Sequence, residues 1–489
     1  MVRVLRRPGL VAVLIVCPLF LFRSVSAQPD VQITGLDGLV QVGRAGGAIA
    51  LSLETTLCNV GDKAVDWFAV PDERHPFMAF NLYRLENDVL EQIGLSWAKH
   101  GVAATQEDRC DLGCQHVILG LRLGVGCSDS YSPEVNADQE HMGPRREIGA
   151  WFGTFDYLDS HFFLQGGDTH NQVEHRLQTR DQDIDPSLHP GARFFVEAMF
   201  ISHDDKNPTN SIAWREFRVV RRTLADWQFE FLETDVTLGP VLDVWDADLQ
   251  VNTEDNSLLG DGTVYVSSKV TSGPTGVWHY EYALFNYNLD RSVAAFGLEM
   301  TPETWVEKVG FGAPVAEEGY SNDPWEWGRE NGFHWDTGTV ERNPFSNPIR
   351  WGTLYNFRFD SIHAPVESVA ILTTFLPSSV RKIPARVLSP EPGGLFLRGD
   401  CEGNGFVGGD VGDALIILLY LFVGGAEPPC MAACDFDISA RVDMVDAIRS
   451  MTFSFYGSPD PGLPFPDCGP LALESDRWLG CENQRTECP

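Results

Sequence analysis

The stretch CDFDISARVDMVDAI, which begins at Cys434, places four acids within twelve residues and then continues as an apolar segment. These acids are Asp435, Asp437, Asp443 and Asp446. Carboxylates at this spacing repel one another unless a cation lies among them. This part of the chain is therefore constrained to a cation-binding loop that leads into a helix, or to a solvated acidic turn that caps a helix.

An EF-hand-type loop binds calcium through oxygen ligands at positions 1, 3, 5, 9 and 12 and through a backbone carbonyl at position 7. In a loop that starts at Asp435, the remaining ligands are Asp437, Ser439, the carbonyl of Arg441, Asp443 and Asp446. Position 6, which is glycine in such loops because the turn is sharp, is Ala440 here. Position 12 is Asp in place of the usual bidentate Glu. We expect a helix from residue 446 to about residue 456.

A second copy of the pattern lies upstream, in GDCEGNGFVGGDVGDALIILLYLF from residue 399 to residue 422. The expected ligands of this copy are Asp400, Glu402, Asn404, Asp410 and Asp413. Position 6 is the expected glycine, Gly405. A two-residue insertion, Gly408-Gly409, precedes the late ligands and must bulge outward if this loop is to bind calcium.

Paired loop–helix units of this kind resemble a type I dockerin domain, in the form found at the end of many secreted bacterial proteins. The resemblance rests on GDCEGNG, DALIILLYLFVGG, EPPC, CDFD, VDMVDAI, FPDCGP and LGC, within about 85 residues. It implies calcium-dependent folding and a docking partner of the cohesin type. Loop positions 10 and 11, which contribute to partner choice in dockerins, are Met444-Val445 and Val411-Gly412. The usual Ser/Thr pair is absent, which argues against a cellulosomal cohesin.

The first 27 residues have the features of a secretory signal peptide: a basic start, an apolar core at residues 10–22 and small residues at the end. The alternative is a membrane anchor, but the apolar core is shorter than the roughly 20 residues that a spanning helix needs. Loss of this segment removes four arginines and takes the formal net charge from −33 to −37. Such a charge argues against nucleic acid and anionic membranes as partners. We expect a secreted protein, extracellular or at the cell surface, with no membrane insertion.

Ten cysteines remain once Cys17 is lost with the signal peptide, and they fall into two even groups. The groups are Cys58, Cys110, Cys114 and Cys127, and Cys401, Cys430, Cys434, Cys468, Cys481 and Cys488. In an exported chain, even groups indicate disulfides. One pairing of the first group is a short Cys110–Cys114 bridge with a Cys58–Cys127 bridge. The alternative is a zinc site that includes His75, His100 or His116.

The region between these ends predicts a mainly β protein with an antiparallel, β-sandwich-like body. Residues 49–57 and 192–201 have the β-branched and aromatic content of strands, and residues 278–288 and 355–360 alternate apolar and polar positions. We expect domains at residues 28–222 and 223–377, a proline-rich linker at 378–394, the dockerin-like calcium-loop domain at 395–470 and a cysteine-containing tail at 471–489. The body resembles the front part of uncharacterised secreted bacterial proteins through CNVGD, NLYRL, EQIGLSWAKHG, GCSDSYS and RWGTLYNFRFD, and this resemblance implies no particular activity.

Three features of the body have both a functional and a structural interpretation. His170 and His175 form a metal pair or are exposed polar histidines, and DQDID at residues 181–185 binds calcium together with residues 203–205 or is a solvated turn. The third feature is a set of tryptophans, Trp325, Trp327 and Trp335, that stack on sugar rings or belong to a sandwich core.

No short motif of a nucleophile, a metal protease or a phosphate loop is present. The sequence therefore predicts a secreted calcium-binding protein that tethers a β-rich binding or display body to an extracellular partner, with polysaccharide as one ligand class. The alternative is an extracellular polysaccharide hydrolase of the glycosidase type, whose paired carboxylates cannot be picked out among 69 acids.

Overall fold

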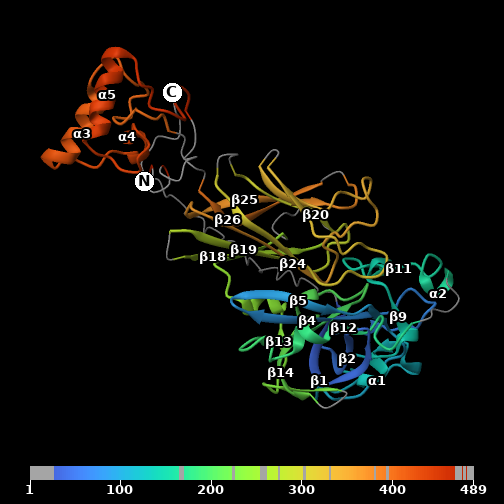
Figure 1. Ribbon diagram of the computed structural model, residues 1–489. Helices are drawn as coiled ribbons and strands as arrows, with labels where there is room; N and C mark the ends of the chain where they lie inside the picture. The colour runs from blue at the N-terminus through green and yellow to red at the C-terminus, as the bar shows by residue number, and fades with distance from the viewer. Residues whose placement is uncertain are drawn as a thin grey trace, which may run out of the picture.

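The computed structural model describes residues 27–164, 170–222, 226–253, 261–273, 276–300, 304–329, 332–378, 381–391 and 396–468, together with Asp476, Leu479 and Cys481. The predicted signal peptide lies outside these residues except for Ala27. Antiparallel sheets dominate the described chain, which confirms the prediction of a mainly β protein (Figure 1). In the described chain no helix has the length and apolar content that crossing a membrane requires.

The first unit is built on a sheet of twelve described strands, with the path β1-β2-β12-β5-β4-β13-β14-β15. The sheet curls until its two ends meet: the backbone N–H of Trp227 in β15 donates to Oε1 of Gln41 in β1, at 3.0 Å. The inner face buries a core of aliphatic and aromatic side chains. The strands are β1 (Val31–Ala45), β2 (Ala48–Asn59), β4 (Phe77–Glu86), β5 (Val89–Leu95), β6 (Ala98–His100), β8 (Ser128–Tyr131), β9 (Met142–Gly143), β12 (Leu177–Arg180), β13 (Arg193–Ile201), β14 (Ile212–Arg222), β15 (Trp227–Phe231) and β16 (Thr237–Leu238).

Short elements complete this unit and its junction with the next. Two-stranded sheets are formed by β3 (Val65–Asp66) with β7 (Arg122–Leu123) and by β10 (Ile148–Gly149) with β11 (Thr154–Phe155). The short helices are η1 (Ile118–Gly120), α1 (Pro133–Asn136), η2 (Gln139–His141), η3 (Arg145–Glu147), α2 (His161–Leu164), η4 (Asp181–Ile184), η5 (Pro208–Asn210) and η6 (Val241–Trp245).

The second unit is a sandwich of two five-stranded sheets that share one core. One sheet contains β17 (Leu249–Asn252), β18 (Val264–Ser272), β19 (Trp278–Asn286), β24 (Thr353–Ser361) and β21 (Glu307–Gly312). The other contains β22 (Glu326–Gly328), β23 (Phe333–Asp336), β20 (Val293–Leu298), β25 (Pro365–Thr374) and β26 (Lys382–Pro390). The alternation predicted for β19 and β24 is confirmed, because Tyr280, Tyr282, Leu284, Tyr355, Phe357 and Phe359 all lie in this core.

A third apolar core joins the two units. It contains side chains of β4 and β13 from the first unit and of β19 and β24 from the second. The guanidinium of Arg145 is fully buried at this junction and donates to the carbonyl oxygens of Phe80 in the first unit, at 2.9 Å, and of Gly352 in the second, at 3.0 Å. The buried charge is therefore satisfied by acceptors on both sides, which holds the two units in one body.

Two predicted boundaries differ from the structure. The boundary near Arg222 falls inside the first sheet, because β15 and β16 both pair with β14, and the strands of the second unit begin at Leu249. The predicted linker at 378–394 contains β26, which pairs with β25 along its whole length. Strand β26 is an edge strand of its sheet, and edge strands accept prolines such as Pro384 because one row of N–H groups has no partner strand.

The C-terminal unit contains the helices α3 (Gly412–Val423), α4 (Met431–Cys434) and α5 (Met444–Tyr456) and lies at one end of the sandwich (Figure 1). Helices α3 and α5 pack against each other over a small core that includes Ile417 and Ala447. The disulfides Cys401–Cys434 and Cys430–Cys481 cross this unit.

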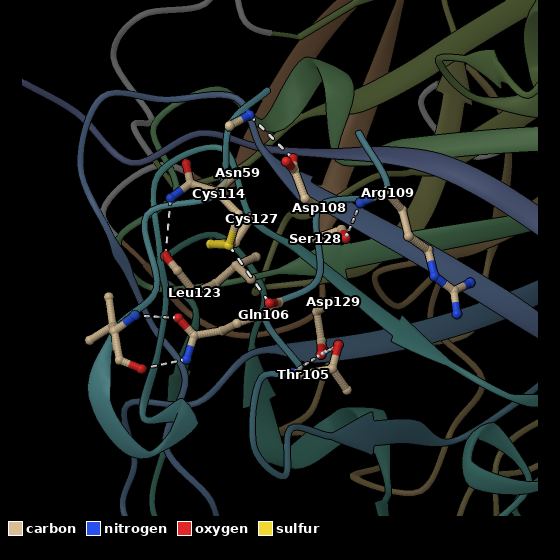
Figure 2. The surroundings of a disulfide bond; sticks show 12 residues. Asn59, Thr105, Gln106, Asp108, Arg109, Cys114, Leu123, Cys127, Ser128 and Asp129 are labelled. Carbon is tan, nitrogen blue, oxygen red and sulfur yellow. Dashed lines mark hydrogen bonds between the residues drawn. A yellow bond between two sulfur atoms is a disulfide. The ribbon is translucent and has the colours of Figure 1, made fainter. Parts of the chain in front are cut away.

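The first cysteine group forms disulfides, but the pairing of Cys110 with Cys114 and of Cys58 with Cys127 is not the one observed. The bridges are Cys58–Cys110 and Cys114–Cys127. Cys58 in β2 lies directly opposite Ser128 in β8, so Cys127, one residue earlier, faces the other side of the ladder. Figure 2 shows the Cys114–Cys127 bridge beside Gln106, whose side chain exchanges two hydrogen bonds with the backbone of Val117. The disulfides use all four cysteines, which excludes the zinc alternative.

Candidate metal centre

The loop that starts at Asp435 is organised by two carboxylates. Asp435 accepts the backbone N–H of Ser439 at 2.9 Å and that of Ala440 at 3.0 Å. Asp446 accepts the backbone N–H of Asp437 at 3.1 Å and that of Asp443 at 2.8 Å. The two side chains therefore fold the loop back on itself and bring its first and last acids together.

The loop that starts at Asp400 repeats this arrangement. Asp400 accepts the backbone N–H of Asn404 at 2.9 Å and that of Gly405 at 2.8 Å, at the same spacing of four and five residues. Asp413 accepts the backbone N–H of Glu402 at 3.2 Å, as Asp446 does from Asp437. The two loops therefore share one pattern of side chain to backbone hydrogen bonds in addition to their sequence pattern.

The acids just before the two helices, Asp410 and Asp443, also make equivalent hydrogen bonds. Asp410 accepts the N–H of Gly412 at 2.9 Å, and Asp443 accepts the N–H of Val445 at 2.7 Å, each at the start of the helix that follows its loop. Gly408 and Gly409 both adopt positive φ, and a Cβ added to Gly409 would contact nothing within 4 Å. Gly409 therefore points outward, whereas Gly408 lies against the ring of Phe453, where a Cβ would be 3.1 Å from the nearest ring carbon.

Three carboxylates converge in the Asp435 loop. Oxygen atoms of Asp435, Asp437 and Asp446 lie within 4.8 Å of one another. Burial, together with the neighbouring charges of Asp437 and Asp435, raises the pKa of Asp446 to about 6. Oδ1 of Asp437 is buried and has no hydrogen-bond partner among the described residues. A buried carboxylate oxygen without a partner, at the centre of an acidic cluster, fits a bound cation.

The other predicted ligands of this loop lie at its rim. The hydroxyl of Ser439 donates to the carbonyl of Arg441 at 3.2 Å, so these two groups contact each other. Asp443 is exposed and caps α5. The structure thus brings three of the six predicted ligands into one cluster and leaves the other three beside it.

The acids of the Asp400 loop are less closely gathered, because no group of three is as compact there among the described residues. The Glu402 carboxylate lies against the start of α3, where a Cβ on Gly412 would be 2.5 Å from Oε2, and the amide of Asn404 donates to it. Burial, with the charges of Asp400 and Glu402, raises the pKa of Asp413 to about 7. As in the other loop, burial and neighbouring carboxylates therefore disfavour the ionised form of the last acid.

A disulfide links the two loops beside their first acids. Cys401 follows Asp400 directly, Cys434 precedes Asp435 directly, and these two cysteines are bonded. The first acid of each loop is therefore held close to the other loop by a covalent bridge.

The helices of the C-terminal unit expose apolar side chains on the faces that do not pack together. On α3 the exposed residues recur at helical spacing, which places them on one face. The exposed apolar residues of the two helices are Leu415, Leu419, Phe422 and Val423 on α3 and Met444, Val445, Ile448, Phe455 and Tyr456 on α5. Exposed apolar patches of this kind are typical of interaction surfaces.

The tryptophan set of the body belongs mainly to the sandwich core. Trp325 and Trp335 are buried, and only Trp327 is exposed, at 53%. DQDID is separated from residues 203–205 by the nine-residue strand β13, so the two acidic segments lie at opposite ends of that strand and cannot share an ion.

The expected histidine pair is also accounted for by packing. The rings of His170 and His175 are 5.4 Å apart, but His175 is buried and stacked on Trp97 at 3.5 Å. The prediction that these histidines are exposed is therefore wrong for His175.

A groove of about 550 Å³ lies on the outer face of the second sheet of the sandwich. Its floor crosses Gly297, and its walls include His334, Asp336, Arg342, Thr373 and Lys382. Its position follows from strand alternation, because Phe333 and Trp335 point into the core and the residues beside them point outward. Sequence reasoning missed this groove, since nothing in the local pattern marks a glycine as its floor.

Comparisons with known proteins add little to this geometry. No protein-family profile matches the chain, and no curated protein matches it. Among solved structures, the C-terminal domain of the Streptococcus pyogenes antigen I/II-family protein AspA is 11% identical in sequence. That comparison covers 75% of this chain and 99% of the other, with a TM-score of 0.16, which is too low to carry any argument.

Proposed function

We propose that the chain is a secreted calcium-binding protein whose C-terminal unit tethers the β-rich body to an extracellular partner. The observation that carries this proposal is the hydrogen-bond pattern common to the two acidic loops, with three carboxylates converging in one of them. A solvated acidic turn does not require the same four side chain to backbone hydrogen bonds in two places.

Calcium suits these loops because their side chains offer only oxygen ligands, which hard cations prefer. Asp435, Asp437 and Asp446 would hold the ion in one loop, and Asp400 and Asp413 in the other. The ion supplies positive charge where burial and mutual repulsion now raise the carboxyl pKa values. Because the ligands belong to both ends of each loop, binding free energy contributes directly to folding of the unit.

The tethering role is supported by the exposed apolar faces of α3 and α5. Both helices begin at the calcium loops, so the ions would fix the orientation of these faces. The resemblance to dockerin domains makes a cohesin-like protein the expected class of partner. The four described disulfides suit an oxidising, extracellular setting.

The body would supply the binding or display function. The groove over Gly297 has walls of both charge signs and hydroxyl groups beside an apolar floor. Hydroxyl-rich, uncharged ligands match such a surface, and a polysaccharide is therefore the ligand class that we propose to test.

The test is calcium titration calorimetry on the full chain, with circular dichroism before and after a chelator. The chain should bind two calcium ions and gain helical signal, and Asp446→Asn and Asp413→Asn should each remove one binding event. Asp460→Asn, an exposed acid outside both loops, should retain both. Absence of calcium-dependent heat and of any change in the helical signal would overturn the proposal.

A further inference from the structure

Asp66, His203 and Asp204 bring one potential metal-ligand atom each to within 4.8 Å of the others, in the first unit. Asp66 ends the short strand β3, while His203 and Asp204 follow the end of β13. We propose that these three side chains bind a divalent first-row transition ion, with zinc as the representative. This site is independent of the calcium loops and of the tethering function.

The separation of the ligand atoms fits a shared ion better than a direct contact. Nε2 of His203 lies 3.6 Å from Oδ2 of Asp66. That distance is too long for a hydrogen bond. Two ligands of one tetrahedral zinc ion, each about 2.0–2.2 Å from the metal, lie roughly 3.4 Å apart. Only a small adjustment would therefore be needed to accommodate the ion.

Hydrogen bonds orient both carboxylates and leave oxygen lone pairs for a ligand. Oδ1 of Asp66 accepts from Nε of Arg122 at 2.8 Å, so its Oδ2 remains directed at His203. Asp204 accepts the hydroxyl of Ser202 at 2.7 Å on one oxygen and the N–H of Asp66 at 3.0 Å on the other. Metal-binding carboxylates are commonly held in this way by an outer shell of donors.

The imidazole of His203 is the second, independent observation. Its Nδ1 is buried without a hydrogen-bond partner among the described residues, and its Nε2 has only the long contact to Asp66. The side chain is 30% exposed, so Nε2 is open to water, and it is the buried Nδ1 that lacks a partner. An ion between the two residues would replace the long contact of Nε2 with Asp66 by a bond to each, and nitrogen ligation favours zinc, copper, iron or nickel over calcium.

The surroundings provide both rigidity and access. The backbone of residues 202–203 packs closely on Gly153. A Cβ at residue 153 would lie 2.3 Å from the backbone nitrogen of His203. His203 also lines a hollow of about 520 Å³, together with Glu73, Arg74, Glu147 and Thr154. The hollow offers an entry route for the ion and room for water as a fourth ligand.

The site should be tested on the full chain saturated with calcium, so that the C-terminal loops do not compete. Zinc titration calorimetry should give one ion per chain, and cobalt substitution should give visible d–d absorption. His203→Ala and Asp66→Asn should each weaken zinc binding at least about tenfold, since even outer-shell changes cost 10- to 100-fold. Asp66→Asn keeps the side-chain shape, so it remains informative if His203→Ala does not fold.

Two controls separate this proposal from others. His170→Ala should leave zinc binding unchanged, which distinguishes the site from the His170–His175 pair. Asp446→Asn should also leave it unchanged, so failure of the calcium proposal does not affect the result. The proposal is overturned if the wild-type chain binds no zinc under these conditions, or if His203→Ala and Asp66→Asn bind it as tightly as wild type.

Discussion

Gly405 and Ala440 occupy the same position in the two C-terminal loops, and both have left-handed backbone, with φ of +88° and +63°. Each donates its N–H to the first acid of its loop, Asp400 or Asp435. The turn requires this conformation in both loops, but only one loop has the residue that adopts it without strain.

Ala440→Gly should therefore stabilise the C-terminal unit. Relief of left-handed strain outweighs the added backbone entropy of glycine, and we expect a gain of up to about 1 kcal/mol. Calcium affinity of this loop should rise by up to about fivefold, as measured by calorimetry. Gly405→Ala is the matched variant and should have the opposite effect in the other loop. Equal affinities for all three proteins would contradict this interpretation.

The Cys401–Cys434 bridge should contribute to calcium binding as well as to stability. It closes a loop with a sequence separation of 33 and ties the first acids of the two loops together. Replacing both cysteines by serine should cost about 3 to 4 kcal/mol of unfolding free energy in the C-terminal unit. In this double variant, calcium should restore only part of the helical circular-dichroism signal, and the calcium concentration needed should be higher than for wild type. Unchanged calcium affinity would show that the bridge does not organise the loops.

The stability of the body should depend on pH through Glu197. Its carboxylate is fully buried and accepts hydrogen bonds from Asn81, Tyr83 and the N–H of Val241. Burial nevertheless raises its pKa to about 7 from the ordinary 4.5. The folded protein thus holds a proton that the unfolded chain has lost, so stability falls as pH rises from about 4.5 to about 7 and is constant above that.

Glu197→Gln should remove this part of the pH dependence. The difference between wild type and variant in unfolding free energy should change by on the order of 3 kcal/mol between pH 4.5 and pH 8. Urea unfolding at both pH values measures it, and the comparison cancels the contribution of other buried acids. If wild type and variant differ in unfolding free energy by the same amount at both pH values, the raised pKa of Glu197 does not contribute to the pH dependence of stability.

Gly297→Leu should fill the groove on the sandwich without disturbing the sheet. A Cβ at this position would lie 3.7 Å from the carbonyl oxygen of Ile371 and 3.8 Å from Cβ of His334, which are ordinary contacts. In affinity electrophoresis against neutral polysaccharides, retardation of the wild-type chain should be lost in the variant. A substitution at exposed Val369, on a neighbouring strand but outside the groove lining, serves as the control. If the Gly297→Leu variant is still retarded, the polysaccharide binds to another surface of the protein.

The sequence was most informative where the determining contacts are local. The hydrogen bonds of the acidic loops span at most eleven residues, and the spacing of the acids was enough to predict that Asp435, Asp437 and Asp446 meet, although not that the other predicted ligands lie beside them. The same holds for β19 and β24, whose alternation predicts the side chains that face the sandwich core, although the opposite face is also buried, against the first unit. Helix α5 also ends at Tyr456, as predicted, although it begins two residues early.

Long-range contacts could not be predicted in this way. Asp66 is 138 residues from Asp204, and no local pattern connects them. The pairing of Cys58 with Cys110 depends on the register between β2 and β8, which a cysteine count does not contain. Strand β26 was missed because its prolines suggest a linker, whereas its position at the edge of a sheet makes them acceptable.

The end of the described chain folds back to the beginning of the C-terminal unit. Asp476 forms an ion pair with the fully buried Arg398, which also donates to the carbonyl of Asp435, and Cys481 is bonded to Cys430. A carboxypeptidase that trims the chain would meet this covalent clasp at Cys481 before it reached Asp476. In a protease-rich environment, this bond should therefore protect the C-terminal unit from trimming for as long as it stays oxidised.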